Sequence, residues 1–149
     1  MAQKTSTRQR ATALIFKADT VLMIRRNRDD FEGFIFPGGG VEEGETPEQG
    51  LIREVMEELS VQVETYEYIG MVQDTDIEIP NRNPIPKQDC YCYIITKYAG
   101  ELEIGAEDKA RMTPTNTYTL VWMPISDLRK LGFVYPADVI ALVESHRTK

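Results

Sequence analysis

The sequence predicts one domain of the mixed α/β (α+β) class, and three observations lead to this. The length of 149 residues fits a single domain of ordinary size. Short β-rich runs alternate with two or three helical segments, an order typical of α/β and α+β sandwiches. No repeat, low-complexity tract or linker divides the chain. We therefore expect one domain over residues 1–149, with residues 1–9 as a flexible tail.

The N-terminal part predicts a β-hairpin. Residues 10–18 and 20–26 are β-rich runs that are separated by Asp19. A polar loop over residues 27–33 is expected next. A short strand over residues 34–36 follows, and it stops at a proline and three glycines.

A helix over residues 46–59 is the clearest element of the sequence. Thr46 is a good N-cap, Pro47 occupies the first helical position, and Gln49 completes a capping box with Thr46. One face of this helix is apolar and is expected to pack on the sheet; it carries Leu51, Ile52, Val55 and Leu59.

The remaining elements are three strands and two helices. The strands are expected over residues 62–73, 90–98 and 117–123, and a Pro- and Asn-rich loop over 74–89 connects the first two. Ser126 is expected to cap a short helix in the segment DLRKL. A closing amphipathic helix is expected over residues 136–146, with its inward positions at Val139, Leu142 and Val143.

Charge is concentrated in one segment. The chain has 17 basic and 24 acidic residues, for a net charge of −7, and residues 39–61 alone hold seven acids and one base. The rest of the chain is thus nearly neutral. Affinity for long nucleic acid comes from Lys and Arg, so such a partner is not expected. Clustered carboxylates without His or Cys suit hard cations such as Mg²⁺ or Mn²⁺.

Cysteine and histidine usage excludes other kinds of site. Cys90 and Cys92 are too few for a disulfide framework and fit a reducing cytosol. They lie two apart on a predicted strand, which favours two buried small side chains. A single histidine, His146, argues against His-rich zinc sites and Ser-His-Asp chemistry. No secretory signal or membrane-spanning run is found, so we expect a cytoplasmic protein without a membrane partner.

Three glutamates on the helix form the candidate site. Glu54, Glu57 and Glu58 are three and four residues apart, so they share one helix face. Like charges there repel one another, and a divalent cation reverses this cost. The preceding glycines can present backbone oxygens or amides to the same metal or to a phosphate. Metal, phosphate and carboxylates together favour attack of water on a phosphoanhydride, with one glutamate as base.

These residues resemble the Nudix box. The family pattern is G-x5-E-x7-R-E-U-x-E-E-x-G-U, where U is aliphatic, and it spans 23 residues. The sequence matches it from Gly39 to Val61, with Ser60 in place of the last glycine. The preceding segment FIFPGGGVEEGE is also similar to the family. The resemblance implies the Nudix fold, a mixed β-sheet between helices, and Mg²⁺-dependent hydrolysis of a nucleoside diphosphate linked to another group.

The resemblance also implies roles for individual residues. Arg53 would orient the glutamates and Glu45 would brace the loop. The base would be a box glutamate, Glu54 or Glu58, or an acid on a distant loop, where Glu101, Glu103, Glu107 and Asp108 are candidates. We favour Glu107 among these four, because GAEDKAR is expected to be a mobile loop. The metal ligands would be Glu54, Glu57, Glu58 and the carbonyl of Gly38.

Substrate and assembly stay open at this stage. A (d)NTP-like small nucleotide is the leading expectation, and a dinucleoside polyphosphate, ADP-ribose or a nucleotide sugar is the alternative. A non-catalytic nucleotide-binding module is the alternative from another class. Homodimers are common in the family and are not excluded here. Phosphate contact and ordinary strand-end charge are both open for Arg25 and Arg26, and loop 74–89 is either a lid or a plain connection.

Overall fold

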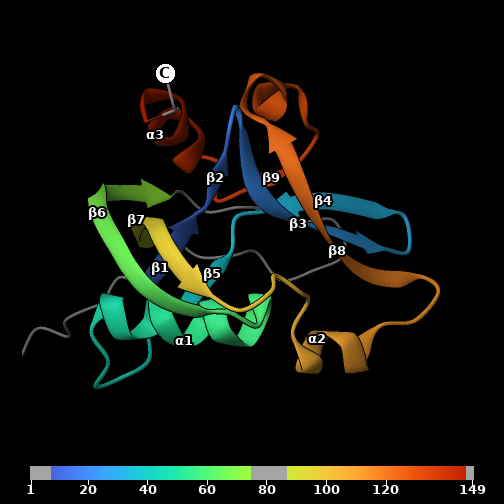
Figure 1. Ribbon diagram of the computed structural model, residues 1–149. Helices are drawn as coiled ribbons and strands as arrows, with labels where there is room; N and C mark the ends of the chain where they lie inside the picture. Colours follow the sequence, from blue (N-terminus) through green and yellow to red (C-terminus); the bar gives the residue numbers. More distant parts are fainter. Residues whose placement is uncertain (1–7, 75–86, 147–149) are drawn as a thin grey trace, which may run out of the picture.

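A computed structural model describes residues 8–74 and 87–146 of the chain, in which the strands form two sheets (Figure 1). The four-stranded sheet has the order β5-β1-β7-β6, in which β1 pairs antiparallel with β5 and parallel with β7. Its strands are β1 (Arg8–Leu14), β5 (Gly38–Gly40), β6 (Gln62–Asp74) and β7 (Gln88–Ala99). Parallel and antiparallel pairs therefore mix within one sheet, as expected.

The five-stranded sheet has the order β2-β3-β4-β9, and β8 also pairs with β3. Its strands are β2 (Phe16–Lys17), β3 (Thr20–Arg28), β4 (Phe31–Ile35), β8 (Asn116–Pro124) and β9 (Val134–Tyr135). The helices are α1 (Pro47–Leu59), α2 (Ala106–Arg111), the 3-10 helix η1 (Ile125–Lys130) and α3 (Val139–Ser145). The mixed α+β class is thus confirmed, with the strands divided between two sheets.

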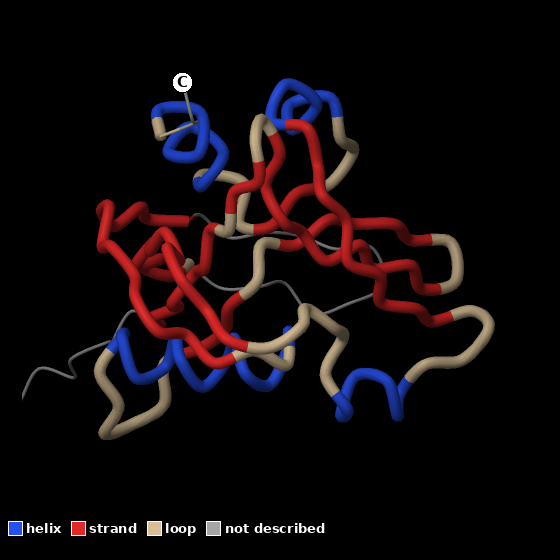
Figure 2. Tube along the Cα trace, in the orientation of Figure 1, coloured by secondary structure: helices blue, strands red, loops and turns tan. Residues whose placement is uncertain are grey.

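Helices lie on opposite sides of the strands (Figure 2). In this view α1 and α2 lie below the strands, and η1 and α3 lie above them. One hydrophobic cluster joins the apolar face of α1 to β1, β3 and β7. A second cluster lies between the two sheets and extends to η1 and α3. The expected arrangement of strands between helices is therefore present.

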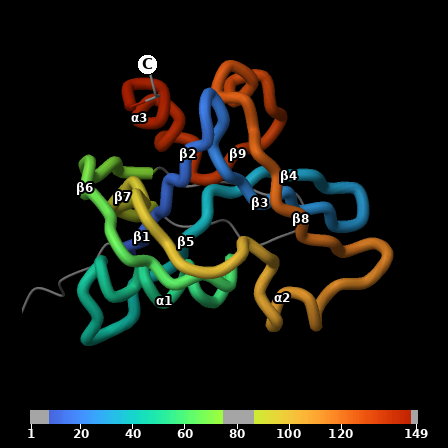
Figure 3. The backbone as a smooth tube through the Cα atoms, in the orientation of Figure 1, coloured from blue at the N-terminus to red at the C-terminus, as the bar shows by residue number. Residues whose placement is uncertain are grey.

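The predicted hairpin of residues 10–18 and 20–26 is wrong in its pairing (Figure 3). β1 ends at Leu14 and pairs with β5 and β7, and only the two residues of β2 pair back onto β3. Ala18, with φ of 52°, makes the turn between β2 and β3. The chain changes sheets after Leu14, and hydrophobicity alone does not mark this point, because both runs are buried.

The predicted polar loop over residues 27–33 is also wrong, because β3 and β4 pair through most of it. Arg28 pairs with Phe31 across a tight turn. Asp29 has φ of 54°, a left-handed conformation that Asp tolerates better than most residues. The polar residues are thus the end of a hairpin.

The C-terminal elements are mostly as predicted. The strands expected over 62–73, 90–98 and 117–123 are β6, β7 and β8. The segment predicted as a loop, GAEDKAR, instead contains helix α2. The expected cap at Ser126 is wrong, because η1 begins one residue earlier and follows Pro124. Most of the predicted loop 74–89 lies outside the described residues.

Three smaller differences concern chain ends and burial. β1 begins at Arg8, inside the predicted tail. The closing helix α3 is shorter than predicted, and Ile140 is buried while Leu142 is only half-buried. The two cysteines are free and fully buried, as expected. None of the helices in the described ranges has the length and apolar content that crossing a bilayer requires.

Candidate metal centre

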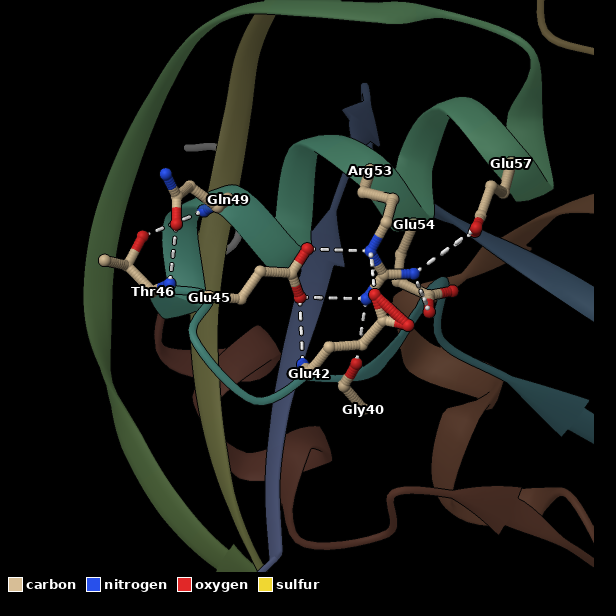
Figure 4. Close-up of polar contacts among 8 residues, drawn as sticks. All are labelled: Gly40, Glu42, Glu45, Thr46, Gln49, Arg53, Glu54 and Glu57. Atoms are coloured by element: carbon tan, nitrogen blue, oxygen red, sulfur yellow. Dashed lines mark hydrogen bonds and ion pairs between the residues drawn. The ribbon is translucent and has the colours of Figure 1, made fainter.

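The start of α1 has the predicted capping box (Figure 4). The backbone amide of Gln49 donates to Thr46 Oγ1 at 3.1 Å, and the amide of Thr46 donates to Gln49 Oε1 at 2.9 Å. Leu51, Val55 and Leu59 are fully buried against the sheet. These contacts fix the rotation of α1 about its axis, so its acidic side chains approach the three glycines of β5.

Arg53 binds the loop before the helix. Its Nε donates to Glu45 Oε2 at 2.8 Å and its Nη2 donates to Glu45 Oε1 at 3.0 Å. Nη2 also donates to the carbonyl of Gly40 at 3.0 Å. These hydrogen bonds lower the pKa of Glu45 to about 2, so the carboxylate stays ionised. The bidentate pair joins the loop to the helix.

The same guanidinium also holds two of the expected ligands. Arg53 Nη1 lies 2.9 Å from Glu54 Oε1 and 3.2 Å from Glu57 Oε2 (Figure 4). Glu42 approaches Arg53 Nε at 3.4 Å. One cation thus contacts four carboxylates, which leaves an excess of negative charge on this face.

Glu58 is directed to the other side, toward Gly38. The backbone amide of Gly38 donates to Glu58 Oε1 at 2.7 Å. Burial raises the pKa of Glu58 to about 8, although this hydrogen bond opposes the shift. Gly38 has φ of 139°, and a Cβ there would lie 2.1 Å from the carbonyl oxygen of Ala11. Only glycine fits this position, which brings Gly38 and Glu58 together.

Gly39 leaves room for the carboxylate of Glu54. A Cβ on Gly39 would lie 2.3 Å from Glu54 Cδ and 2.5 Å from its two oxygens. The glycine of the box therefore has a steric role, because any side chain there would displace Glu54.

The donors present fit a hard divalent cation. They are carboxylate oxygens of Glu54, Glu57 and Glu58 beside the backbone of Gly38, with no sulfur or imidazole. Among residues 8–74 and 87–146, no three such side chains already lie close enough together to hold a metal. The contacts explain this, because Arg53 holds Glu54 and Glu57 while Gly38 holds Glu58. A bound cation would have to draw these carboxylates away from their present partners.

The two acids of α2 point in different directions. The side chain of Glu107 is 78% exposed and lies 4.0 Å from Arg111. The side chain of Asp108 is only 19% exposed, and its charge contributes to the raised pKa of Glu58. Burial also raises the pKa of Asp108 itself. The structure therefore brings Asp108, and not the favoured Glu107, toward the box glutamates.

Ser60 ends α1 in the conformation that the family's glycine would adopt. Its φ is 63° and its ψ is 23°, in the left-handed region. Its hydroxyl donates to the carbonyl of Glu103 at 3.0 Å. The departure from the box pattern thus changes a helix cap and removes no group from the site.

The consecutive arginines of β3 have separate environments. Arg25 forms an ion pair with Glu32 in which both side chains are nearly half exposed. Arg26 donates to Asn116 Oδ1 at 3.0 Å, and its guanidinium lies 4.3 Å from the centre of the Tyr118 ring. The charge of Arg26 also acts on Asp108. Of the two arginines, Arg26 is therefore the one whose charge acts on an acid of α2.

Sequence reasoning missed Arg10. This side chain is buried between the sheets, and its charge acts on Glu58. A signal was present: Arg10, Thr12 and Leu14 alternate along β1, so an arginine falls on an inward face of a strand.

Comparison with known proteins agrees with this geometry. The chain matches the NUDIX domain family over residues 6–143. An ADP-ribose pyrophosphatase from Methanocaldococcus jannaschii is 32% identical over 97 residues, and the match spans 64% of this chain but only 54% of that protein. An 8-oxo-dGTP diphosphatase from Escherichia coli is 40% identical over 48 residues, which are 32% of this chain and 35% of that protein.

Solved structures have the same fold. The crystal structure of a MutT NUDIX hydrolase from Burkholderia pseudomallei superposes with a TM-score of 0.67 at 21% identity, over 91% of this chain and 96% of that chain. At this identity the likeness concerns the fold alone. The family match extends over nearly the whole sequence and includes the helix, the glycine turn and the glutamates described above, so the chain belongs to the NUDIX domain family.

Proposed function

We propose that this protein is a Mg²⁺-dependent pyrophosphohydrolase, which cleaves a phosphoanhydride bond in a nucleoside diphosphate linked to another group. One observation carries the proposal: three glutamates of one helix turn lie beside the glycines of β5, with Glu54 and Glu57 held by Arg53 and Glu58 held by Gly38. Mn²⁺ is expected to substitute for Mg²⁺, since both prefer oxygen ligands. The named relatives, a pyrophosphatase and a diphosphatase, support the same class of reaction.

The residues divide into ligands and supports. Glu54, Glu57, Glu58 and the carbonyl of Gly38 would hold the metal. When bound, a divalent cation would neutralise charge on the phosphate oxygens and lower the pKa of a bound water. Arg53 and Glu45 hold the helix and the loop in register, and thereby keep the ligands on one side of the turn.

The general base belongs to one of two groups. Glu54 or Glu58 would act from the box itself, and an acid on α2 would act from a distance. Within α2 the exposure favours Asp108 over the sequence-based choice of Glu107, because the side chain of Asp108 is 19% exposed and that of Glu107 is 78% exposed.

The proposed substrate is a small nucleotide of the (d)NTP type. The relative named as an 8-oxo-dGTP diphosphatase supports this choice, and the ADP-ribose pyrophosphatase keeps ADP-ribose as the alternative. Dinucleoside polyphosphates and nucleotide sugars have the same reactive bond and belong to the same test. A homodimer and a cytoplasmic location complete the proposal.

The test is Mg²⁺-dependent hydrolysis of a nucleotide panel by the wild type and by Glu58→Gln. The panel holds (d)NTPs, 8-oxo-dGTP, ADP-ribose, a diadenosine polyphosphate and a sugar nucleotide, with products separated by chromatography. Glu64→Gln is the matched control, because Glu64 lies on β6 and, among the described residues, its one polar contact is with Lys97, at 3.9 Å. We expect one substrate class to be cleaved by the wild type and the control, and cleavage to be lost in folded Glu58→Gln.

Two outcomes would contradict the proposal. Turnover that survives in Glu58→Gln would show that the site is elsewhere. The second outcome is that the wild type cleaves no substrate and that calorimetry detects no Mg²⁺ binding that depends on Glu58. This result would favour a non-catalytic binding module over an enzyme. The presence of all three box glutamates favours the enzyme.

A further inference from the structure

Arg10 is a buried cation without a carboxylate partner. It is 6% exposed, on the face of β1 that lies between the two sheets. No ion pair joins it to a carboxylate within the described part of the chain. Arginine is rarely buried so deeply unless it is paired, because removing an unpaired charge from water is costly. The burial of Arg10 without an ion pair therefore suggests that its side chain has a specific role.

Neutral groups surround the guanidinium. Nη2 donates to the carbonyl of Phe36 at 2.6 Å, and Nε donates to Thr12 Oγ1 at 3.1 Å. The guanidinium also lies 5.0 Å from the centre of the Tyr135 ring. Arg10 thus contacts a backbone carbonyl, a hydroxyl and an aromatic face, which together hold its guanidinium in place.

Its strongest contact fixes the segment that leads to the metal centre. Phe36 lies between β4 and β5, two residues before Gly38. Phe36 also donates its amide to the carbonyl of Tyr135 at 2.9 Å, and the amide of Ala13 donates to the carbonyl of Pro37 at 2.8 Å. Of these three anchors, only that of Arg10 comes from a side chain.

We infer that Arg10 is a positioning residue of the metal centre, because it anchors Phe36 and thereby Gly38. The inference rests on the proposed function, because it takes Gly38 and Glu58 as ligands. Arg10 is not expected to touch the substrate. Residues that support metal ligands in this way typically contribute 10- to 100-fold to metal affinity or activity.

The test measures Mn²⁺ binding to the full chain by electron paramagnetic resonance, without substrate. Arg10→Met removes the charge and the hydrogen bonds, and we expect it to weaken Mn²⁺ binding by about 10- to 100-fold. Arg10→Lys keeps the charge but cannot bind Phe36 and Thr12 together, so its loss should be smaller. Arg25→Met is the matched control, because it removes one positive charge from an exposed pair on β3. It should bind Mn²⁺ as the wild type does.

Each outcome has one meaning. Folded Arg10→Met with the Mn²⁺ affinity of the wild type overturns the inference and leaves the proposed function intact. If Arg10→Met does not fold, Arg10→Lys decides, and unchanged affinity in that variant overturns the inference. If Glu57→Gln binds Mn²⁺ as tightly as the wild type does, the assigned metal site is wrong, and the inference fails with it.

Discussion

The two terminal oxygens of Glu45 each accept a hydrogen bond from Arg53, at 2.8 and 3.0 Å, across the turn that precedes α1. Arg53 uses its remaining nitrogen to hold Glu54 and Glu57. One side chain therefore connects the loop, the helix and two expected ligands. Because the contact to Glu45 is a planar fork, it depends on the shape of the guanidinium as well as on its charge.

Arg53→Lys should therefore lower kcat/KM by about 10- to 100-fold while the protein stays folded. Lysine keeps the charge but cannot bind both oxygens of Glu45 and the ligands at the same time. Steady-state hydrolysis of the substrate found in the panel measures the loss.

Arg129→Lys is the control for this substitution. Arg129 forms an equally bidentate pair with Glu144, at 2.8 and 2.7 Å, on the surface near α3. Ion pairs on the surface contribute little to stability, and among the described residues this pair contacts no residue of the metal centre, so Arg129→Lys should keep full activity. Equal activity in both variants would show that the fork geometry at Arg53 is unimportant.

The acids of α2 give a second prediction. Asp108→Asn should lower kcat by about 10²- to 10⁴-fold if Asp108 is the general base. Glu107→Gln should have little effect, because that side chain is 78% exposed and contacts only Arg111. The two variants remove one negative charge each from adjacent positions, so they are matched. A large loss in Glu107→Gln with none in Asp108→Asn would restore the choice made from the sequence.

Much of this site could be predicted from the sequence because it depends on local order along the chain. The capping box, the helix bounds and the shared face of Glu54, Glu57 and Glu58 follow from spacing within α1. The roles of Arg53 and Glu45 are what the family resemblance implies and stay predictions, while the contact between these two residues is observed.

What the sequence could not supply depends on contacts between distant segments. Whether Glu107 or Asp108 faces the glutamates depends on the rotation of α2, which is short and has no buried residue to set a pattern. The division of the strands into two sheets depends on pairings between β1 and β7, about 80 residues apart along the chain. The hydrogen bond from Arg10 to Phe36 likewise forms only when β1 and the segment between β4 and β5, 26 residues later, are brought together.

Asp74 gives a prediction about pH and stability. It is 2% exposed at the end of β6, and burial together with the charge of Asp138 raises its pKa from 3.8 to about 6. The folded state therefore holds this proton more tightly than the unfolded chain. Its contribution to stability is complete below pH 3.8 and is lost as the pH rises toward 6.

Asp74→Asn should thus stabilise the protein at pH 8, by up to about 3 kcal/mol, and should have little effect near pH 4. Urea unfolding at both pH values measures the difference. Asp89→Asn is the control on the neighbouring strand, where the carboxylate is half-buried and accepts a hydrogen bond from Gln73 at 3.1 Å. A variant of Asp74 that is less stable than the wild type at pH 8 would show that the charged carboxylate is the favoured form.

Ser60 tests the one departure from the box pattern. Its left-handed conformation costs about 1 kcal/mol, and its hydrogen bond to the carbonyl of Glu103 returns about 1 kcal/mol. Ser60→Ala keeps the strain and loses the bond, so it should lower the free energy of unfolding by about 1 kcal/mol.

Ser60→Gly loses the same bond but also relieves the strain, so its stability should lie close to that of the wild type. The comparison of the two variants by urea unfolding isolates the backbone conformation from the hydrogen bond. Neither variant should change hydrolysis or Mn²⁺ affinity, because Ser60 contacts no residue of the metal centre through its side chain. Equal destabilisation of both variants would mean that the left-handed backbone at Ser60 carries no strain, and that the serine serves through its hydrogen bond alone.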